Sequence, residues 1–102
     1  MPSRDPLSPA DLEAALASLG GWRAEADGDG NRIVREFRLG DFRAAFAFLT
    51  RVAFEAEDLD HHPEIHNVYD RVRLALTTHD AGNRVTETDL DLARRIDRLA
   101  TD

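Results

Sequence analysis

The stretch DFRAAFAFLTRVAFEAED, residues 41–58, organises the rest of the chain. Asp41 is a favourable helix N-cap, and neither proline nor glycine interrupts the residues after it, so we predict a helix from Phe42 to Asp58. The predicted buried stripe, at helical spacing, consists of Phe42, Ala45, Phe46, Leu49, Val52, Ala53 and Ala56. Phe48 and Phe54 fall outside this stripe. They are either partly exposed aromatics under neighbouring loops or part of a second contact surface.

Before the long helix, the sequence predicts one helix and two strands. Ser8-Pro9 is typical of a helix start, because serine caps the first turn and proline is tolerated at its first position. Gly20-Gly21 ends this helix. A short strand opens at Trp22, and a longer strand covers Arg32–Leu39 after a cluster of turn-forming residues.

After the long helix, the sequence predicts two more strands and a last helix. Pro63 disfavours a continued helix, and Ile65–Tyr69 is a short strand-forming run. Arg71–Thr78 alternates between apolar and polar residues, as a strand with one buried face does. Thr86 then caps the last helix, with Asp89 placed as in a capping box.

The order of elements is therefore α-β-β-α-β-β-α. This order predicts an α+β fold: a four-stranded antiparallel sheet with three helices packed on one face. We expect a flexible lead-in over residues 1–7 and a single domain over residues 8–102. The other face of the sheet would stay open, and a second copy of the chain could extend its edge.

The composition excludes several classes of function. The chain has 102 residues and a formal net charge of −7, with 13 basic residues that are all arginine. This charge disfavours general binding of nucleic acid and of anionic membranes. The absence of cysteine and lysine excludes thiolate catalysis, zinc–thiolate sites and a Schiff base on this chain. No apolar run is long enough to span a bilayer, and no signal peptide is evident, so we expect a soluble cytoplasmic protein.

All four histidines lie within residues 61–79. His61 and His62 follow the long helix, His66 lies in the next predicted strand, and His79 ends the strand after that. A tight turn near Asp70 would pair these two strands as a hairpin and place residue 78 or 79 opposite residues near 61. The sequence therefore predicts that several imidazoles converge at one end of the sheet.

Three interpretations of these histidines compete. They could be solvated residues of a polar loop. They could also bind a metal, with His62, His66, His79 and Asp60 as ligands, although Pro63 disfavours the helix on which a His-x-x-x-His pair usually binds one. The third interpretation is acid–base catalysis, since imidazole titrates near neutrality and can both donate and accept a proton.

The catalytic interpretation has support from neighbouring carboxylates. Glu57, Asp60 and Asp89 could orient the imidazole rings. This region has no serine or cysteine nucleophile. The chemistry would therefore be proton transfer, as in elimination, hydration or tautomerisation, rather than covalent catalysis.

Three short stretches near the histidines resemble the signature of a known enzyme family. They are EDLDHHPE at residues 57–64, NVY at 67–69 and TTHD at 77–80. The chain is similar here to the pterin-4a-carbinolamine dehydratases, also known as the dimerisation cofactor of a hepatocyte nuclear factor. The resemblance extends to FRAAFAFLTRVA at 42–53 and TETDLDLA at 86–93, and covers nearly the whole chain from Leu12 to Leu99.

The resemblance implies dehydration of 4a-hydroxytetrahydrobiopterin, or a related carbinolamine, to the quinonoid dihydropterin, without metal or cofactor. It implies that His61, His62 and His79 are the catalytic histidines. The residues it implies for binding the pterin substrate are Glu57, Asp60, Pro63, Thr77, Thr78, Asp80 and Asp89. Ile65 departs from the aromatic residue frequent in the family, and His66 is expected on the sheet surface.

The resemblance also implies partners. The family forms homodimers by sheet extension and, in some members, homotetramers by helix packing. It recycles the pterin of aromatic amino acid hydroxylases, which implies a functional link to such an enzyme. The alternative is a non-catalytic assembly factor or coactivator of the same fold, and the complete set of His61, His62 and His79 disfavours it.

Overall fold

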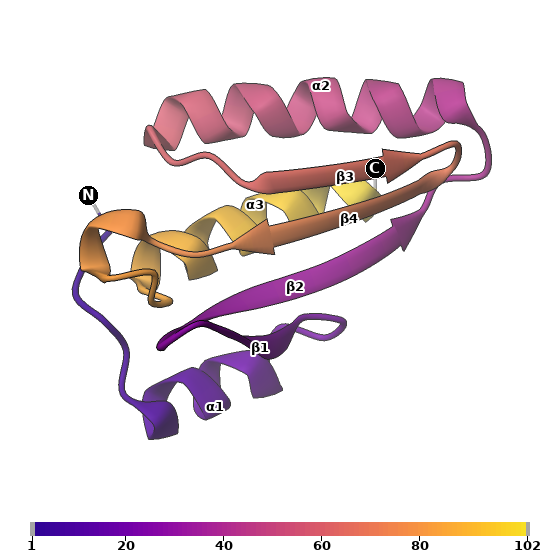
Figure 1. Ribbon diagram of the computed structural model, residues 1–102. Coiled ribbons are helices and arrows are strands. Elements are labelled where there is room, and N and C mark those ends of the chain that lie inside the picture. The colour runs from indigo at the N-terminus through magenta and orange to yellow at the C-terminus, as the bar shows by residue number, and fades with distance from the viewer. Residues whose placement is uncertain (1, 102) are drawn as a thin grey trace.

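A computed structural model describes residues 2–101 of the chain (Figure 1). In chain order, the elements of this part are α1 (Pro9–Ala17), β1 (Arg23–Asp27), β2 (Gly30–Arg38), α2 (Phe42–Leu59), β3 (Glu64–Val68), β4 (Arg71–Leu76), the short 3₁₀ helix η1 (His79–Ala81) and α3 (Glu87–Thr101). The order α-β-β-α-β-β-α predicted from the sequence is confirmed.

The four strands form one antiparallel sheet in the order β1-β2-β4-β3. Two hairpins, β1–β2 and β3–β4, are joined through the central pair β2–β4, in which Val34 lies opposite Ala75. Figure 1 shows α2 crossing from one hairpin to the other. The predicted α+β class with a four-stranded antiparallel sheet is confirmed.

Side-chain caps start the first two helices where the sequence predicted. Ser8 Oγ accepts a hydrogen bond from the backbone N–H of Asp11, and an Asp41 carboxylate oxygen accepts one from that of Ala44. Such caps satisfy amide groups that the first turn of a helix leaves free. Within residues 2–101, no helix is both long and apolar enough to cross a membrane.

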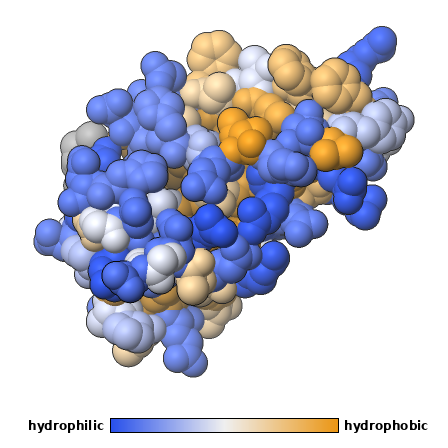
Figure 2. All heavy atoms as spheres, in the orientation of Figure 1, coloured by the Kyte–Doolittle hydropathy of each residue, from blue (hydrophilic) through white to orange (hydrophobic). Residues whose placement is uncertain are grey.

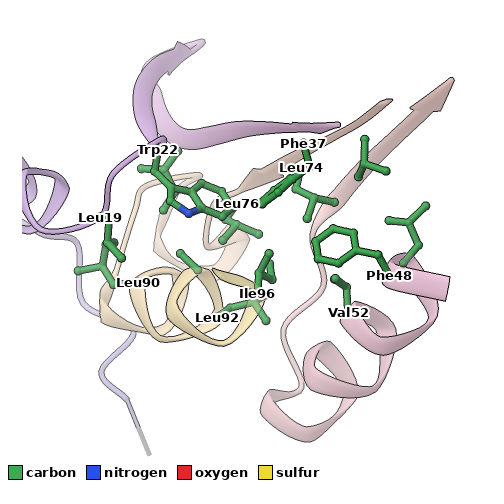
Figure 3. Packing of buried hydrophobic residues seen from close by; sticks show 14 of the residues in the cluster. Leu19, Trp22, Phe37, Phe48, Val52, Leu74, Leu76, Leu90, Leu92 and Ile96 are labelled. Atoms are coloured by element: carbon green, nitrogen blue, oxygen red, sulfur yellow. The ribbon is translucent and has the colours of Figure 1, made fainter. Parts of the chain in front are cut away.

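The core lies between the sheet and the helices, and it corrects the predicted face of the long helix (Figure 3). Phe48 is 1% exposed and its ring centroid lies 5.0 Å from that of Phe37, whereas Phe42 and Phe46 are 49% and 57% exposed. The buried residues of α2 are Ala45, Phe48, Leu49, Val52, Ala56 and Leu59. The prediction that Phe48 lies outside the stripe was wrong, because periodicity alone fits two neighbouring phases of an alanine- and phenylalanine-rich helix.

The exposed aromatic residues of α2 form part of a larger surface, which we call the apolar patch. Its members are Phe42, Phe46, Phe54, Ile65, Val68 and Tyr69, all large and exposed. They lie on the outer side of α2, along the edge strand β3 and in the turn after it, where Figure 2 shows apolar surface gathered. Exposed apolar surface gathered in this way is typical of interaction surfaces.

The opposite face of the sheet carries ion pairs instead of helices. Glu25 accepts hydrogen bonds from Arg32 and Arg73. These guanidinium groups, that of Arg32 first, hold the pKa of Glu25 below its usual range. The charged side chains lie over the strands of this face and leave it polar.

The segment before α1 makes defined contacts. The backbone N–H of Leu7 donates to the carbonyl of Val85, and Pro6 forms an isolated antiparallel bridge with Thr86. These contacts place the segment against the start of α3. The flexibility expected for residues 1–7 stays a prediction.

The position of Phe48 gives a test of the core. Phe48→Ala should lower the free energy of unfolding by about 3–5 kcal/mol, because it removes a buried aromatic ring and leaves a cavity. Arg51→Ala, on the exposed side of the same helix, should change it by less than about 0.5 kcal/mol. Urea unfolding measures both, and equal losses would contradict the observed face of α2.

Candidate functional site

A pocket of about 180 Å³ lies where α2 ends and the chain leaves β4. Its lining residues are Arg4, Asp60, His61, His62, His79 and Asp80. Three of the four histidines therefore meet in one place, together with two carboxylates and one guanidinium. The predicted convergence of imidazoles is confirmed as geometry.

The end of α2 fixes the backbone that carries the first two histidines. Asp60 adopts a left-handed conformation with a φ of 50°. The N–H of Asp60 then donates to the carbonyl of Glu57, and the N–H of His61 donates to that of Ala56. This pair of bonds is a Schellman motif, which closes a helix with one left-handed residue. His61 is held by hydrogen bonds rather than carried on a free loop.

The hairpin β3–β4 brings His79 to the same place. Val68 lies opposite Arg71 and Glu64 opposite Ala75. Tyr69, with a φ of 52°, makes the turn between the two strands. Because opposed residues keep a constant sum of numbers along an antiparallel pair, this register points residue 78 toward residue 61.

His61 is buried and is bound to a buried carboxylate. Its side chain is 6% exposed, and its Nε2 lies 2.5 Å from Oδ1 of the fully buried Asp89. The other carboxylate oxygen of Asp89 accepts bonds from the hydroxyl of Thr78 and from the backbone N–H of Thr86. The Thr86 hydroxyl completes the cluster at 2.7 Å from that of Thr78. Asp89 thus orients His61 and, by accepting from the N–H of Thr86, makes one of the two bonds of the predicted capping box at the start of α3.

His62 and His79 are in a different environment. The side chain of His62 is 61% exposed, and its Nε2 lies 2.5 Å from a carboxylate oxygen of the exposed Glu57. His79 is also exposed, and its Nδ1 lies 2.8 Å from Oδ1 of Asn83. Both rings can reach a bound molecule, and each has one nitrogen oriented by a neighbouring side chain.

Some predicted binding residues lie outside the pocket lining. The hydroxyl of Thr77 donates to the backbone carbonyl of Asn31 in β2, and that of Thr78 faces Asp89. Pro63, Glu57 and Asp89 are adjacent to lining residues but are not part of the lining. His66 lies in a hollow on the ion-paired face of the sheet with Arg73 and Glu36, so its predicted place on the sheet surface is confirmed.

Sequence reasoning missed Arg4 as a pocket residue. Its Nη1 lies 3.5 Å from Nδ1 of His61, and its Nη2 donates to the carbonyl of Asp60 at 3.1 Å. Arg4 stands in a stretch of prolines and charges, far along the chain from every histidine. No spacing or motif connects it with them, so only the folded chain reveals it.

The positions of the acidic and histidine side chains can be compared with those that a metal site would require. Within the described part of the chain, residues 2–101, no three or more His, Asp or Glu side chains are arranged to hold a metal ion. His61 and His62 each have a ring nitrogen bonded to a carboxylate. Imidazoles bonded to carboxylates in this way are able to donate and accept protons.

Comparison with known proteins identifies the family. Residues 5–99 match the family model described as pterin 4 alpha carbinolamine dehydratase. The chain belongs to the pterin-4α-carbinolamine dehydratase family. The resemblance drawn from the motif around His61 and His62 is confirmed as membership.

Two bacterial relatives have high identity to this member of the family. A protein of Opitutus terrae is 48% identical over 94 residues, which is 92% of this chain and 93% of its own. A protein of Chloroflexus aurantiacus is 53% identical over 93 residues, which is 91% of this chain and 95% of its own. Both are provisionally named pterin-4-alpha-carbinolamine dehydratase.

Two solved structures share the fold. A transcriptional coactivator/pterin dehydratase from Brucella melitensis has a TM-score of 0.86 and 42% identity, over 94% of this chain and 99% of its own. A pterin dehydratase-like protein described as a RuBisCO assembly factor in the alpha-carboxysome has a TM-score of 0.66 and 26% identity, over 78% of this chain and 89% of its own. The fold of this family therefore carries more than one function.

The buried carboxylate gives a test of how the site is supported. Asp89→Ala should lower the free energy of unfolding by about 3 kcal/mol, since it leaves buried donors of Thr78, Thr86 and His61 without an acceptor. Asp91→Ala, on the same helix, removes only a surface ion pair with Arg95 and should cost less than about 1 kcal/mol. If thermal and urea unfolding give the same loss for both variants, Asp89 does not hold these segments together.

Proposed function

We propose that this protein dehydrates 4a-hydroxytetrahydrobiopterin, or a related 4a-carbinolamine, to the quinonoid dihydropterin and water. The observation that carries this proposal is the pocket in which His61, His62 and His79 meet. Family membership supports the substrate class, and the pocket supplies the groups that the reaction needs.

The reaction is an elimination of water across two atoms of the pterin. The bond from C4a to the hydroxyl oxygen breaks, and the leaving oxygen takes up a proton. The proton on N5 is removed, and its bonding electrons form the double bond between N5 and C4a. One general acid and one general base are sufficient, and positioned imidazoles can perform both tasks near neutral pH. No electrons enter or leave, so the reaction requires no redox cofactor.

The exposed histidines are the groups that we assign to proton transfer. His62 faces the pocket with Glu57 behind its Nε2, and His79 faces it with Asn83 behind its Nδ1. Each partner leaves the other ring nitrogen free to meet the substrate. His61, buried against Asp89, completes the catalytic set from the wall of the pocket.

The remaining predicted residues divide into two groups. Asp60 and Asp80 line the pocket and would contact the pterin ring, whereas Pro63, next to His62 but outside the lining, would shape the edge of the site. The hydroxyl groups of Thr77 and Thr78 are bonded within the protein. We therefore propose that the two threonines support the site rather than bind the substrate through their side chains.

The cellular setting follows from the substrate. A 4a-hydroxypterin is the product of a hydroxylation that uses a reduced pterin and oxygen. An aromatic amino acid hydroxylase is the corresponding source, and we propose that this protein acts beside such an enzyme in the cytoplasm.

A second candidate is an assembly or coactivator function without catalysis. This function is a candidate because the chain shares its fold with the RuBisCO assembly factor and with the Brucella coactivator. It requires a docking surface but no histidines, so a dehydration assay separates the two functions. The three histidines in one pocket support the enzyme.

Replacement of single histidines tests the catalytic assignment. His62→Ala and His79→Ala should each lower the rate of dehydration by about 10²–10⁴-fold, which is the usual contribution of one general acid or base. His66→Ala is the matched control and should lose less than about tenfold, because its side chain lies on the sheet surface. A stopped-flow assay of 4a-hydroxytetrahydropterin, corrected for the spontaneous reaction, measures these rates.

Two results would contradict the assignment. One is a loss in His66→Ala as large as in His62→Ala and His79→Ala. The other is a wild-type rate no higher than the spontaneous rate, which would instead favour the non-catalytic function. Wild-type activity should also survive thorough chelation, because no step uses a metal.

The apolar patch and the edge strand β3 support a homo-oligomer. Phe54 is 71% exposed, and β3 has one edge free of any strand partner within the described chain. A second copy can cover the patch and extend the sheet, giving a homodimer, or a homotetramer if both surfaces are used.

The oligomer is tested by mass in solution. At micromolar concentration, sedimentation should show a dimer or tetramer of the wild type. Phe46→Asp, which places a charge in the apolar patch, should shift the mass downward, whereas Arg23→Ala on the ion-paired face should not. A monomeric wild type would exclude the proposed assembly.

A further inference from the structure

The segment Pro2–Leu7 lies along the start of α3, and the side chain of Arg4 reaches from it to the end of α2. The carbonyl of Ser3 accepts hydrogen bonds from the backbone N–H of Thr88 at 3.3 Å and from its hydroxyl at 3.1 Å. Three residues further on, Pro6 bridges to Thr86. Arg4 lies between these anchors, and its side chain reaches the pocket.

The guanidinium of Arg4 is hydrogen-bonded to the end of α2. Its Nη2 donates to the carbonyl of Asp60 at 3.1 Å and lies 3.4 Å from that of Leu59. Carbonyl groups at a helix C-terminus carry partial negative charge and favour a cation. These two carbonyl groups hold the guanidinium of Arg4 in place. A third contact joins it to His61.

That third contact determines which nitrogen of His61 carries a proton. Arg4 Nη1 lies 3.5 Å from Nδ1 of His61, and a guanidinium has donors but no acceptor. Nδ1 must then present its lone pair to Arg4. Nε2 faces the carboxylate of Asp89, which needs a donor, so the single ring proton belongs on Nε2.

We propose that Arg4 is a positioning residue of the catalytic site, and that the segment Pro2–Leu7 is a strap that holds it there. Arg4 holds His61 in the tautomer that carries its ring proton on Nε2. Without the guanidinium, Nδ1 loses the donor that fixes this tautomer. This role for Arg4 rests on the proposed function only where it concerns the rate.

The charged and titratable groups around His61 come from every neighbouring element. Arg4 faces it from the strap and Asp89 from α3. The other such groups of the pocket are Asp60, His62, His79 and Asp80. Of these groups, Arg4 is the one that has donors and no acceptor at any pH near neutrality, so it can only donate to the ring of His61.

A fixed tautomer of His61 has a consequence for the proposed reaction. With Nδ1 directed at Arg4 and Nε2 at Asp89, the ring keeps one orientation in the wall of the pocket, beside His62 and His79. A ring that changes its tautomer or orientation would alter the wall that faces the substrate. Arg4 would thus affect turnover without contacting the substrate.

The experiment measures the protonation of His61 directly, in the ligand-free protein. Long-range ¹H–¹⁵N spectra of the labelled protein at pH 7 distinguish the two neutral tautomers from the imidazolium, with the signals of His61 assigned by their loss in His61→Gln. The spectra are compared for the wild type, Arg4→Ala, Arg4→Lys and Asp5→Ala. Asp5→Ala is the matched control, because it alters the adjacent side chain of the strap but keeps the bond of its backbone N–H to Ser3.

The wild type, Arg4→Lys and Asp5→Ala should show His61 protonated on Nε2 alone, since lysine also offers only donors. Arg4→Ala should show a proton on Nδ1 of His61 in part of the molecules, because the donor that faced this nitrogen is gone. Its kcat should fall about tenfold with a smaller change in KM, and Arg4→Lys should recover part of the loss.

Two results would overturn the proposal: a proton on Nδ1 of His61 in the wild type, or an unchanged His61 spectrum in folded Arg4→Ala. If Arg4→Ala does not fold, the wild-type spectrum still decides. If the wild type has no dehydratase activity, the proposed function fails, while the spectra judge the role of Arg4 independently.

Discussion

The structure depends on one buried carboxylate. Asp89 has no exposed surface, and burying a charge without partners would cost several kcal/mol. It is surrounded by donors from three segments: the start of α3 at Thr86, the chain after β4 at Thr78, and the chain after α2 at His61. The pocket exists where these segments meet, so the support of the fold and the support of the site are the same interaction.

Adjacent histidines acquire opposite properties from this arrangement. His61 and His62 are neighbours in the chain, and beyond a helix end successive side chains point in different directions. One ring turns inward to Asp89 and is 6% exposed, whereas the other turns outward to Glu57 and is 61% exposed. His61 is therefore a fixed part of the pocket wall, whereas His62 is accessible to a bound molecule. Two residues of one type can thus have distinct roles in a small site.

The main features of the fold were predictable because they depend on local chemistry. Caps at Ser8 and Asp41 start helices wherever they occur, and alternation along Arg71–Thr78 indicates a strand with one buried face. The face of α2 was predicted incorrectly, since Phe46 and Phe48 fit neighbouring phases of the same helix equally well. Packing against Phe37 of the sheet decides between them, and this contact lies outside the helix itself.

The sequence by itself determined the order of elements, the family, and the set of histidines with their motif neighbours. It also placed His79 near His61, because the register of a hairpin follows from its turn. Only the tertiary structure decided which histidine is buried, that Thr77 and Thr78 turn their hydroxyl groups into the protein, and that Arg4 lines the pocket. These features arise from contacts between residues far apart in the chain, whose geometry is set when the segments pack together and has no signature in local spacing.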